Sequence, residues 1–191
     1  MNDIVLKALA PERLTDLIDF FEQRAFADHP QWRSCYCHFP HADHDRVVWK
    51  ERSADENRAA TGERVAAGTM QGWLAYADGA VVGWCNAGPR VLIGGMFDEP
   101  EPLAERIGAI VCFVVAPDWR GRGVATALLQ RACEGLAAQG FEWAEGYPRT
   151  GEQSAAANHF GPLAMFEVAG FRVHKPDDDD GVVVRRRLQA P

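Results

Sequence analysis

Apolar positions recur along the chain with two spacings, one typical of helices and one typical of strands. Leu14, Leu17, Ile18 and Phe21 lie on one helical face behind Pro11, a residue that favours the first turn of a helix. Short β-branched and aromatic runs bounded by Gly, Pro or Asp predict strands. In chain order, the pattern predicts a strand at 4–9, a helix from Pro11 to about Arg24, a helix at about 54–67, strands at 72–76 and 81–86, a strand at 110–115, a helix at 124–139, a strand at 141–147, a short helix at 162–169, and closing strands at 171–174 and 182–188.

The connections between these elements predict the fold class. Asp78-Gly79 between two apolar runs indicates a β-hairpin. The continuous apolar run at 110–115 is typical of a central buried strand, and the helix at 124–139 would return the chain to a parallel neighbour. We therefore expect one α/β domain over residues 1–191, with a mixed sheet flanked by helices and with two irregular segments, 28–50 and 87–106.

Composition narrows the class of protein. The chain has 191 residues, is 47% hydrophobic and 25% charged, and carries a formal net charge of −7. These values fit a globular domain, and the acidic balance argues against a nucleic-acid partner. Five cysteines without a secretory signal, and no apolar run near the length of a membrane span, predict a cytoplasmic protein without disulfides or a membrane partner. A homodimer is left open.

A glycine-rich loop after the buried strand carries the clearest chemical signal. Pro117 ends the strand, and the helix begins after Arg120, Gly121, Arg122 and Gly123. Glycines allow positive φ and a close approach of a ligand to the backbone, while the first N–H groups of a helix have no internal partner. Together with the helix dipole, these groups predict an anion site suited to a diphosphate. The alternative interpretation is an Arg-Gly surface turn in front of an ordinary helix.

Three sequence blocks resemble the GNAT superfamily of acyl-CoA-dependent N-acetyltransferases. The loop Arg120-Gly121-Arg122-Gly123-Val124-Ala125 resembles the family's phosphate motif, Met165–Phe171 resembles its helix that ends in Gly-Phe, and Gly83-Trp84 fits its hairpin. The resemblance covers residues 70–188 well and residues 4–24 loosely.

The resemblance implies a site for acetyl-CoA between the strands at 110–115 and 141–147, which splay apart in the family. Pantetheine would lie in the gap, and a backbone N–H would polarise the thioester carbonyl while an amine attacks directly. Acetyl-CoA would be a co-substrate, and no metal is expected. The implied acetyl-CoA contacts are Phe113, Val114, Val115, Arg120, Gly121, Arg122, Gly123, Val124 and Ala125.

The chain departs from the family at both acid–base positions. Ala109 stands where many relatives have a Glu, and Phe166 stands where many have a Tyr. Glu145 and Tyr147 share one face of their strand and are our candidates for the base and the acid. The alternative is that Glu145 pairs with an arginine and Tyr147 only packs. His159 is a further candidate.

The segment 28–50 combines aromatic side chains with potential metal ligands. Cys35, Cys37, His38, His41 and His44 are all potential zinc ligands, but their spacing does not match a zinc knuckle. We instead expect this segment to line the acceptor pocket, where aromatic rings could hold an amine. The candidate substrate-binding residues are Trp32, Tyr36, Phe39 and Trp84.

Two functions follow as expectations. The first is an N-acetyltransferase that acetylates a primary amine of a small molecule. The second, favoured by Ala109 and Phe166, is a catalytically weak module that binds or senses acyl-CoA. We also expect Arg185–Arg187 to form an exposed sheet edge.

Overall fold

A seven-stranded mixed sheet organises the molecule, in the order β1-β2-β3-β4-β5-β7-β6. The computed structural model describes residues 3–97, 100–151, 158–177 and 180–189. No helix of this part of the chain is long and apolar enough to cross a membrane. The strands are β1 (Val5–Ala8), β2 (Gly72–Ala77), β3 (Ala80–Pro89), β4 (Ile107–Val115), β5 (Trp143–Gly146), β6 (Arg172–Pro176) and β7 (Val182–Arg187), and the α-helices are α1 (Leu14–Phe20), α2 (Ala54–Ala66), α3 (Val124–Ala138) and α4 (Leu163–Val168).

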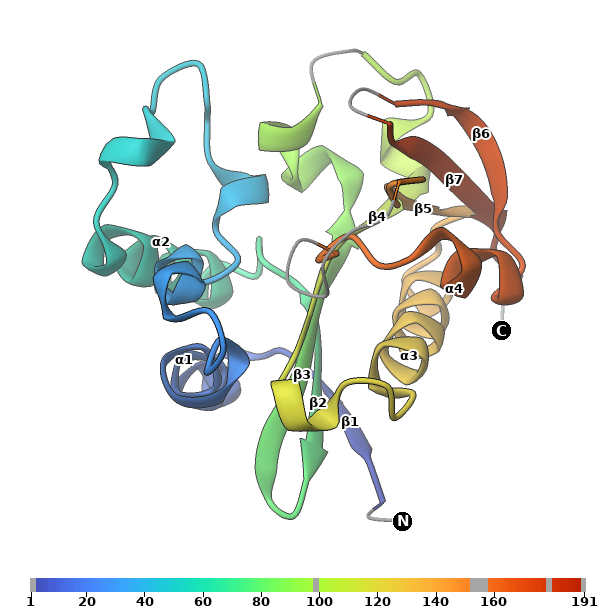
Figure 1. Ribbon diagram of the computed structural model, residues 1–191. Helices are drawn as coiled ribbons and strands as arrows, with labels where there is room; N and C mark the ends of the chain where they lie inside the picture. The colour runs from blue at the N-terminus through green and yellow to red at the C-terminus, as the bar shows by residue number, and fades with distance from the viewer. Residues whose placement is uncertain (1–2, 98–99, 152–157, 178–179, 190–191) are drawn as a thin grey trace.

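Helices cover both faces of the sheet, as Figure 1 shows, with α1 and α2 on one side and α3 and α4 on the other. Apolar side chains of α3, including Leu128 and Leu136, pack against one face of the central strands. Gly83 on β3 permits this packing, because a Cβ there would lie 2.7 Å from Val124 Cγ1. The predicted α/β class with a mixed sheet is confirmed.

Several element boundaries differ from the sequence pattern. The first helix continues beyond α1 as a π-helical turn at Phe21–Ala25. β4 begins at Ile107, three residues earlier than predicted, while β5 is shorter than the strand predicted at 141–147. Residues 178 and 179 of the closing turn lie outside the described residues.

The expectation of an exposed edge at Arg185–Arg187 is wrong. β7 lies between β5 and β6, so it is an interior strand. The side chain of Arg185 is only 10% exposed, and its guanidinium donates to two carboxylates, those of Glu101 and Glu145. The run of three arginines suggests a solvent-exposed strand. The ion pairs of Arg185 instead allow this strand to lie inside the sheet.

The splay between β4 and β5 begins halfway along β4. The two strands pair in parallel only from Ile107 with Trp143 to Ile110 with Gly146. On its other side β4 stays paired with β3 as far as Val115, and Val111 is one extra residue in that ladder. Such a bulge bends a strand, so the outer half of β4 turns away from β5 and presents a free edge.

Candidate active site

The free edge of β4 presents the backbone groups of alternate residues. Ala116 donates its N–H to Val82 of β3, so by alternation Val114 faces β3, while Phe113 and Val115 face the gap beside β5. Of the three residues expected to contact pantetheine, Val114 therefore offers its side chain and only the other two offer backbone groups.

Protein groups occupy part of this edge. The Phe113 N–H donates to the carbonyl of His159 at an N···O distance of 2.6 Å. The Val115 carbonyl accepts from Nε of Arg120 at 3.1 Å. The segment around His159 thus lies beside β4, where a ligand strand would pair.

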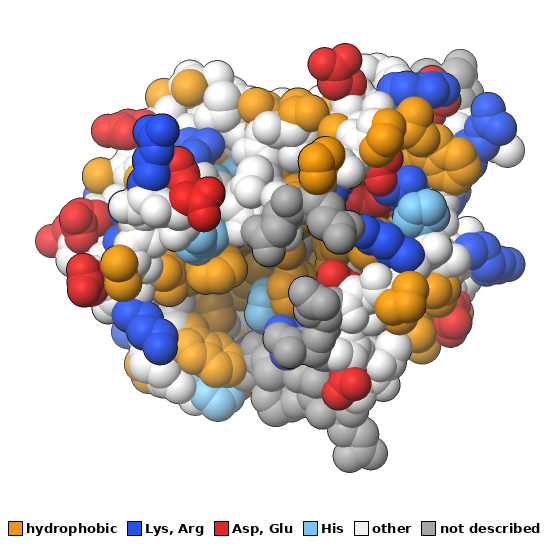
Figure 2. Space-filling view, turned by 90° about the horizontal axis from the view of Figure 1, so that it is seen from above, with side chains coloured by type: hydrophobic (Ala, Val, Ile, Leu, Met, Phe, Trp, Pro, Cys, Tyr) orange, Lys and Arg blue, Asp and Glu red, His pale blue; other side chains and the backbone are white. Residues whose placement is uncertain are grey.

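A groove of about 660 Å³ runs along this edge. One wall is the outer half of β4 with His159 and Phe160, and the opposite wall is the segment between α1 and α2. Seen from above, the molecule is hollowed at this place, and hydrophobic side chains line the hollow (Figure 2).

The start of α3 closes one end of the β4 edge. Gly121 and Gly123 have φ of +70° and +81°, and no side chain caps the helix. Its first turn also lacks an acidic residue, whereas α2 begins with a capping box formed by Ser53 and Glu56. The first N–H groups of α3 are therefore open to an anion, while those of α2 are already satisfied in part.

The two arginines of the loop differ in their surroundings. Arg120 forms a two-point ion pair with Asp28, at 2.5 and 3.2 Å, which joins the loop to the segment after α1. This hydrogen bond and the charge of Arg120 lower the pKa of Asp28. Arg122 lies over the ring of Trp119 at 5.2 Å and forms no ion pair among the described residues, so it is the freer cation.

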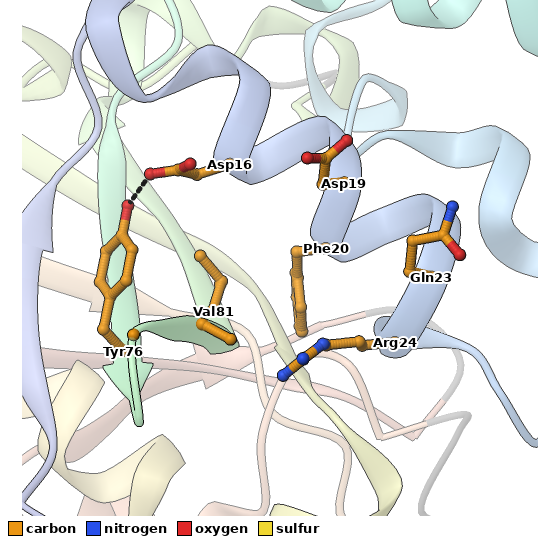
Figure 3. A pocket seen from close by; sticks show the side chains of 9 residues that line it. Asp16, Asp19, Phe20, Gln23, Arg24, Tyr76 and Val81 are labelled. Atoms are coloured by element: carbon orange, nitrogen blue, oxygen red, sulfur yellow. Dashed lines mark hydrogen bonds between the residues drawn. The ribbon is translucent and has the colours of Figure 1, made fainter.

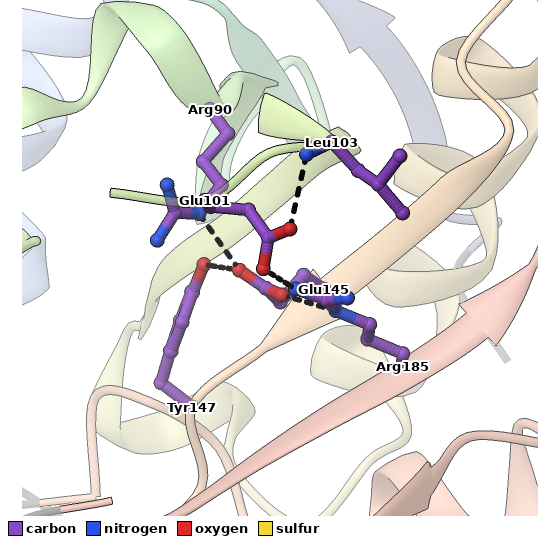
Figure 4. A network of polar contacts seen from close by, with 6 residues as sticks. All are labelled: Arg90, Glu101, Leu103, Glu145, Tyr147 and Arg185. Atoms are coloured by element: carbon purple, nitrogen blue, oxygen red, sulfur yellow. Dashed lines mark hydrogen bonds and ion pairs between the residues drawn. The ribbon is translucent and has the colours of Figure 1, made fainter. Parts of the chain in front are cut away.

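Glu145 and Tyr147, the expected base and acid, belong to a buried polar network (Figure 4). Glu145 is 1% exposed. One of its carboxylate oxygens accepts hydrogen bonds from Tyr147 Oη and Arg90 Nε, and the other accepts one from Arg185 Nε. Burial and the charge of Glu145 raise the pKa of Tyr147 well above its usual value. Neither residue lines the groove. This arrangement favours structural positioning over proton transfer.

The expected substrate-binding residues separate into two pairs. Trp32 and Phe39 line the groove. Trp84 is fully buried against the α1 side of the sheet, and Tyr36 is buried with its hydroxyl donating to Glu22. Trp84 lies opposite Val114 on the same face of the sheet, but it is fully buried among side chains of α1 and does not line the groove.

Comparison with known proteins identifies the fold and the family. The model of the acetyltransferase (GNAT) family matches residues 29–160, which is more than half of the chain. The chain belongs to the GNAT acetyltransferase family. No curated protein sequence matches it significantly.

Solved structures resemble this acetyltransferase at low sequence identity. The PaiA N-acetyltransferase of Thermoplasma acidophilum, solved with coenzyme A, is 14% identical at a TM-score of 0.58, with 97% of this chain and 99% of that chain covered. A GCN5-related N-acetyltransferase from Kribbella flavida is 19% identical at a TM-score of 0.58, with 97% of this chain and 98% of that chain covered. YncA of Salmonella typhimurium, solved with acetyl-CoA, is 14% identical at a TM-score of 0.59, with 98% of this chain and 95% of that chain covered.

In this acetyltransferase, Asn86 holds the segment 28–50, which contains Cys37 and His41, against the sheet. His41 Nδ1 lies 3.1 Å from the Leu92 carbonyl and must donate to it, so His41 Nε2 accepts from Asn86 Nδ2 at 3.0 Å. Asn86 Nδ2 also lies 3.2 Å from Cys37 Sγ. Burial lowers the pKa of His41 to about 4, so His41 is neutral at pH 7.

Cys37 is the most unusual thiol of the segment. Its backbone and that of Tyr36 have positive φ, at 52° and 44°. Burial raises the pKa of Cys37, but hydrogen bonds from Cys112 and Asn86 outweigh burial and lower it overall. No group of three or more potential ligands among the described residues is arranged to hold a metal ion.

The sequence pattern did not single out several groove residues. Trp49, Arg52 and Arg149 line the groove. Asp28 pairs with Arg120 of the phosphate loop, the glycine-rich loop at 120–123. Trp49 could have been found as the aromatic residue that ends the irregular segment just before the Ser53 cap. The pairing of Asp28 with Arg120 had no local signal, because 92 residues separate them.

A second cavity of about 400 Å³ lies between α1 and the β2–β3 hairpin (Figure 3). Asp16 accepts from the Tyr76 hydroxyl there at 2.6 Å. Its lining residues include none of the β4 edge or the phosphate loop. The groove beside β4 is therefore the candidate active site.

Proposed function

We propose that the protein transfers the acetyl group of acetyl-CoA to a primary amine of a small molecule by direct attack. One observation carries this proposal: the half of β4 that no strand pairs on its β5 side and Arg120 of the glycine-rich loop line a single groove, and that loop leads into the uncapped start of α3. Relatives of the same fold, PaiA and YncA, were solved with coenzyme A and acetyl-CoA.

Each half of the donor has a proposed partner. The diphosphate binds the N–H groups of Gly121 to Ala125 with the help of Arg122, and pantetheine lies along Phe113 and Val115. The thioester carbonyl replaces the His159 carbonyl on the Phe113 N–H. One well-placed donor of this kind lowers the barrier by about 3 kcal/mol.

The reaction then needs no covalent intermediate on the protein. The amine nitrogen forms a bond to the acetyl carbon, the bond from that carbon to sulfur breaks, and coenzyme A leaves as a thiolate. The amine gives up one proton, and the thiolate takes up one. The chain contributes chiefly by holding the two substrates in reacting geometry.

A second candidate function is a module that binds acyl-CoA with little turnover. The observation that favours it is the engagement of Glu145 and Tyr147 with Arg90 and Arg185, away from the groove. Under this alternative, acetyl-CoA binds but no amine releases its thiol.

Calorimetry and thiol release distinguish these functions. The proposal predicts saturable binding of acetyl-CoA, together with thiol release that depends on an added amine. Binding without release from a broad amine panel favours the sensing module. Absence of binding overturns both functions.

A further inference from the structure

The groove carries a charge opposite to that of the whole chain. The protein has 27 acidic and 20 basic side chains, yet the ionic side chains among the described groove residues are Lys50, Arg52, Arg120 and Arg149. No Asp or Glu of the described part of the chain lines the groove. A positively charged groove on an acidic protein favours a ligand that carries negative charge.

Two of these cations, Lys50 and Arg52, lie on the wall opposite β4, whereas Arg149 lies over the ring of Phe160. Arg120 belongs to the donor end and is already neutralised by Asp28. Lys50 and Arg52 come instead from the segment before α2, on the opposite wall, where acetyl-CoA has no proposed contact.

Arg52 is held in place by hydrogen bonds to uncharged groups. Its Nε donates to Asn57 Oδ1 at 2.5 Å and its Nη2 donates to the Glu56 carbonyl at 3.1 Å. Among the described residues, neither Arg52 nor Lys50 has a carboxylate within salt-bridge distance. Hydrogen bonds from Ser53 lower the pKa of Glu56, and the charge of Arg52 contributes to this shift. The acceptor wall therefore keeps positive charge available to a ligand.

Aromatic rings accompany this charge. Phe39 and Trp49 meet edge to face, with ring centroids 5.0 Å apart, and both line the groove. Trp32 also lines it and stacks on His29 at 4.6 Å. The same wall thus offers flat apolar surface beside two cations.

These features constrain the amine as well as its substituents. Neighbouring cations disfavour an ammonium ion, and the described lining supplies no carboxylate to take its proton. A lysine-like amine, with a pKa of roughly 10.4, would enter such a groove protonated and could attack only after a base such as the imidazole of His159, which lines the groove, had taken its proton. An amine that is neutral near pH 7 needs no base before it attacks.

We propose that the acceptor is a weakly basic amine on an aromatic frame that carries a carboxylate. The carboxylate pairs with Lys50 and Arg52, the ring packs against Phe39 and Trp49, and the neutral nitrogen faces the Phe113 end of β4. This inference rests on the proposed acetyl transfer and names the substrate class of the same site.

Four amines test both parts of the proposal in a two-by-two design. Aniline and 4-aminobenzoate are weakly basic, without and with a carboxylate; benzylamine and 4-(aminomethyl)benzoate are the strongly basic pair. With acetyl-CoA and the intact protein, thiol release should have the highest kcat/KM for 4-aminobenzoate and the lowest for benzylamine. We expect the carboxylate to raise kcat/KM by about tenfold or more within each pair, the equivalent of one charge-assisted contact.

A charge-reversal variant and a matched control locate the effect. Lys50→Glu should abolish the preference for 4-aminobenzoate over aniline and leave acetyl-CoA affinity unchanged. Arg46→Glu makes the same charge change on the same segment, at an exposed residue outside the groove, and should retain the preference.

The outcomes separate this inference from the proposed function. A higher kcat/KM for benzylamine than for either carboxylate, no release with any of the four amines, or an equal loss of preference in both variants overturns the acceptor inference. Failure of the wild-type protein to bind acetyl-CoA overturns the proposed function itself.

Discussion

Gly123 joins the phosphate loop to α3 at a φ of +81°, and a Cβ built on it would meet nothing within 4 Å. The residue is therefore required for its backbone conformation and for an open approach to the helix N-terminus, not for packing. The sequence motif predicts this role, because glycine spacing after a buried strand is a local signal. It does not predict that the neighbouring Arg120 pairs with Asp28, a contact between residues 92 positions apart.

Gly123→Val should weaken acetyl-CoA binding by about tenfold or more, because the new side chain strains the loop and covers the open N–H groups. Isothermal calorimetry measures the affinity. Gly140→Val is the matched control, since Gly140 has a φ of +87°, equally open surroundings and a place at the other end of α3. Equal affinity loss in both variants would contradict the phosphate-loop assignment.

Tyr147→Phe should leave kcat within about threefold of the wild-type value, because the tyrosine hydroxyl binds Glu145 and lies outside the groove. The ring keeps its contact with Phe97, at a centroid distance of 5.2 Å. A loss of a hundredfold or more, the range expected for a general acid, would show that Tyr147 protonates the leaving thiolate.

At the scale of elements, the Glu145 network fixes the segment between β3 and β4 on the sheet. Arg90 and Glu101 come from that segment, Glu145 from β5 and Arg185 from β7. Hydrophobic periodicity predicts each strand, but these ion pairs join residues 40 to 84 positions apart. For the same reason β7 could not be recognised as an interior strand. The bulge at Val111 could not be predicted either, because no glycine or proline marks it in the sequence.

Glu145→Gln should reduce the free energy of unfolding by about 3 kcal/mol or more, because it leaves two largely buried arginines without their full countercharge. Urea denaturation at pH 7 measures this loss. Glu12→Gln is a control on an exposed ion pair and should change stability by less than about 1 kcal/mol. A loss at Glu145 no larger than that of the control would contradict the structural role.

At the scale of the whole molecule, one neutral histidine ties both irregular segments to the sheet. His41 accepts a hydrogen bond from Asn86 of β3 and donates one to the Leu92 carbonyl. Protonation of His41 would therefore remove the hydrogen bond from Asn86. The folded pKa of about 4 lies below the unfolded value of 6.5. The unfolded chain therefore binds more protons between these pH values, and stability falls as the pH drops through that window.

Lowering the pH from 7 to 5 should remove about 2 kcal/mol of unfolding free energy through His41 alone. Urea denaturation at the two pH values measures the difference. His41→Gln should show a smaller drop, while His174→Gln, at an exposed position on β6, should show the wild-type drop. Identical drops in all three proteins would contradict the role of His41.

The central claim is that acetyl-CoA binds along the free edge of β4 and the open start of α3. Backbone amide NMR tests it most directly, by following each N–H while acetyl-CoA is added to the labelled protein. We predict saturating shifts at Phe113, where the thioester carbonyl displaces that of His159, and at Gly121 to Ala125, where the diphosphate binds. Saturation of the protein with no change at these amides would contradict the account.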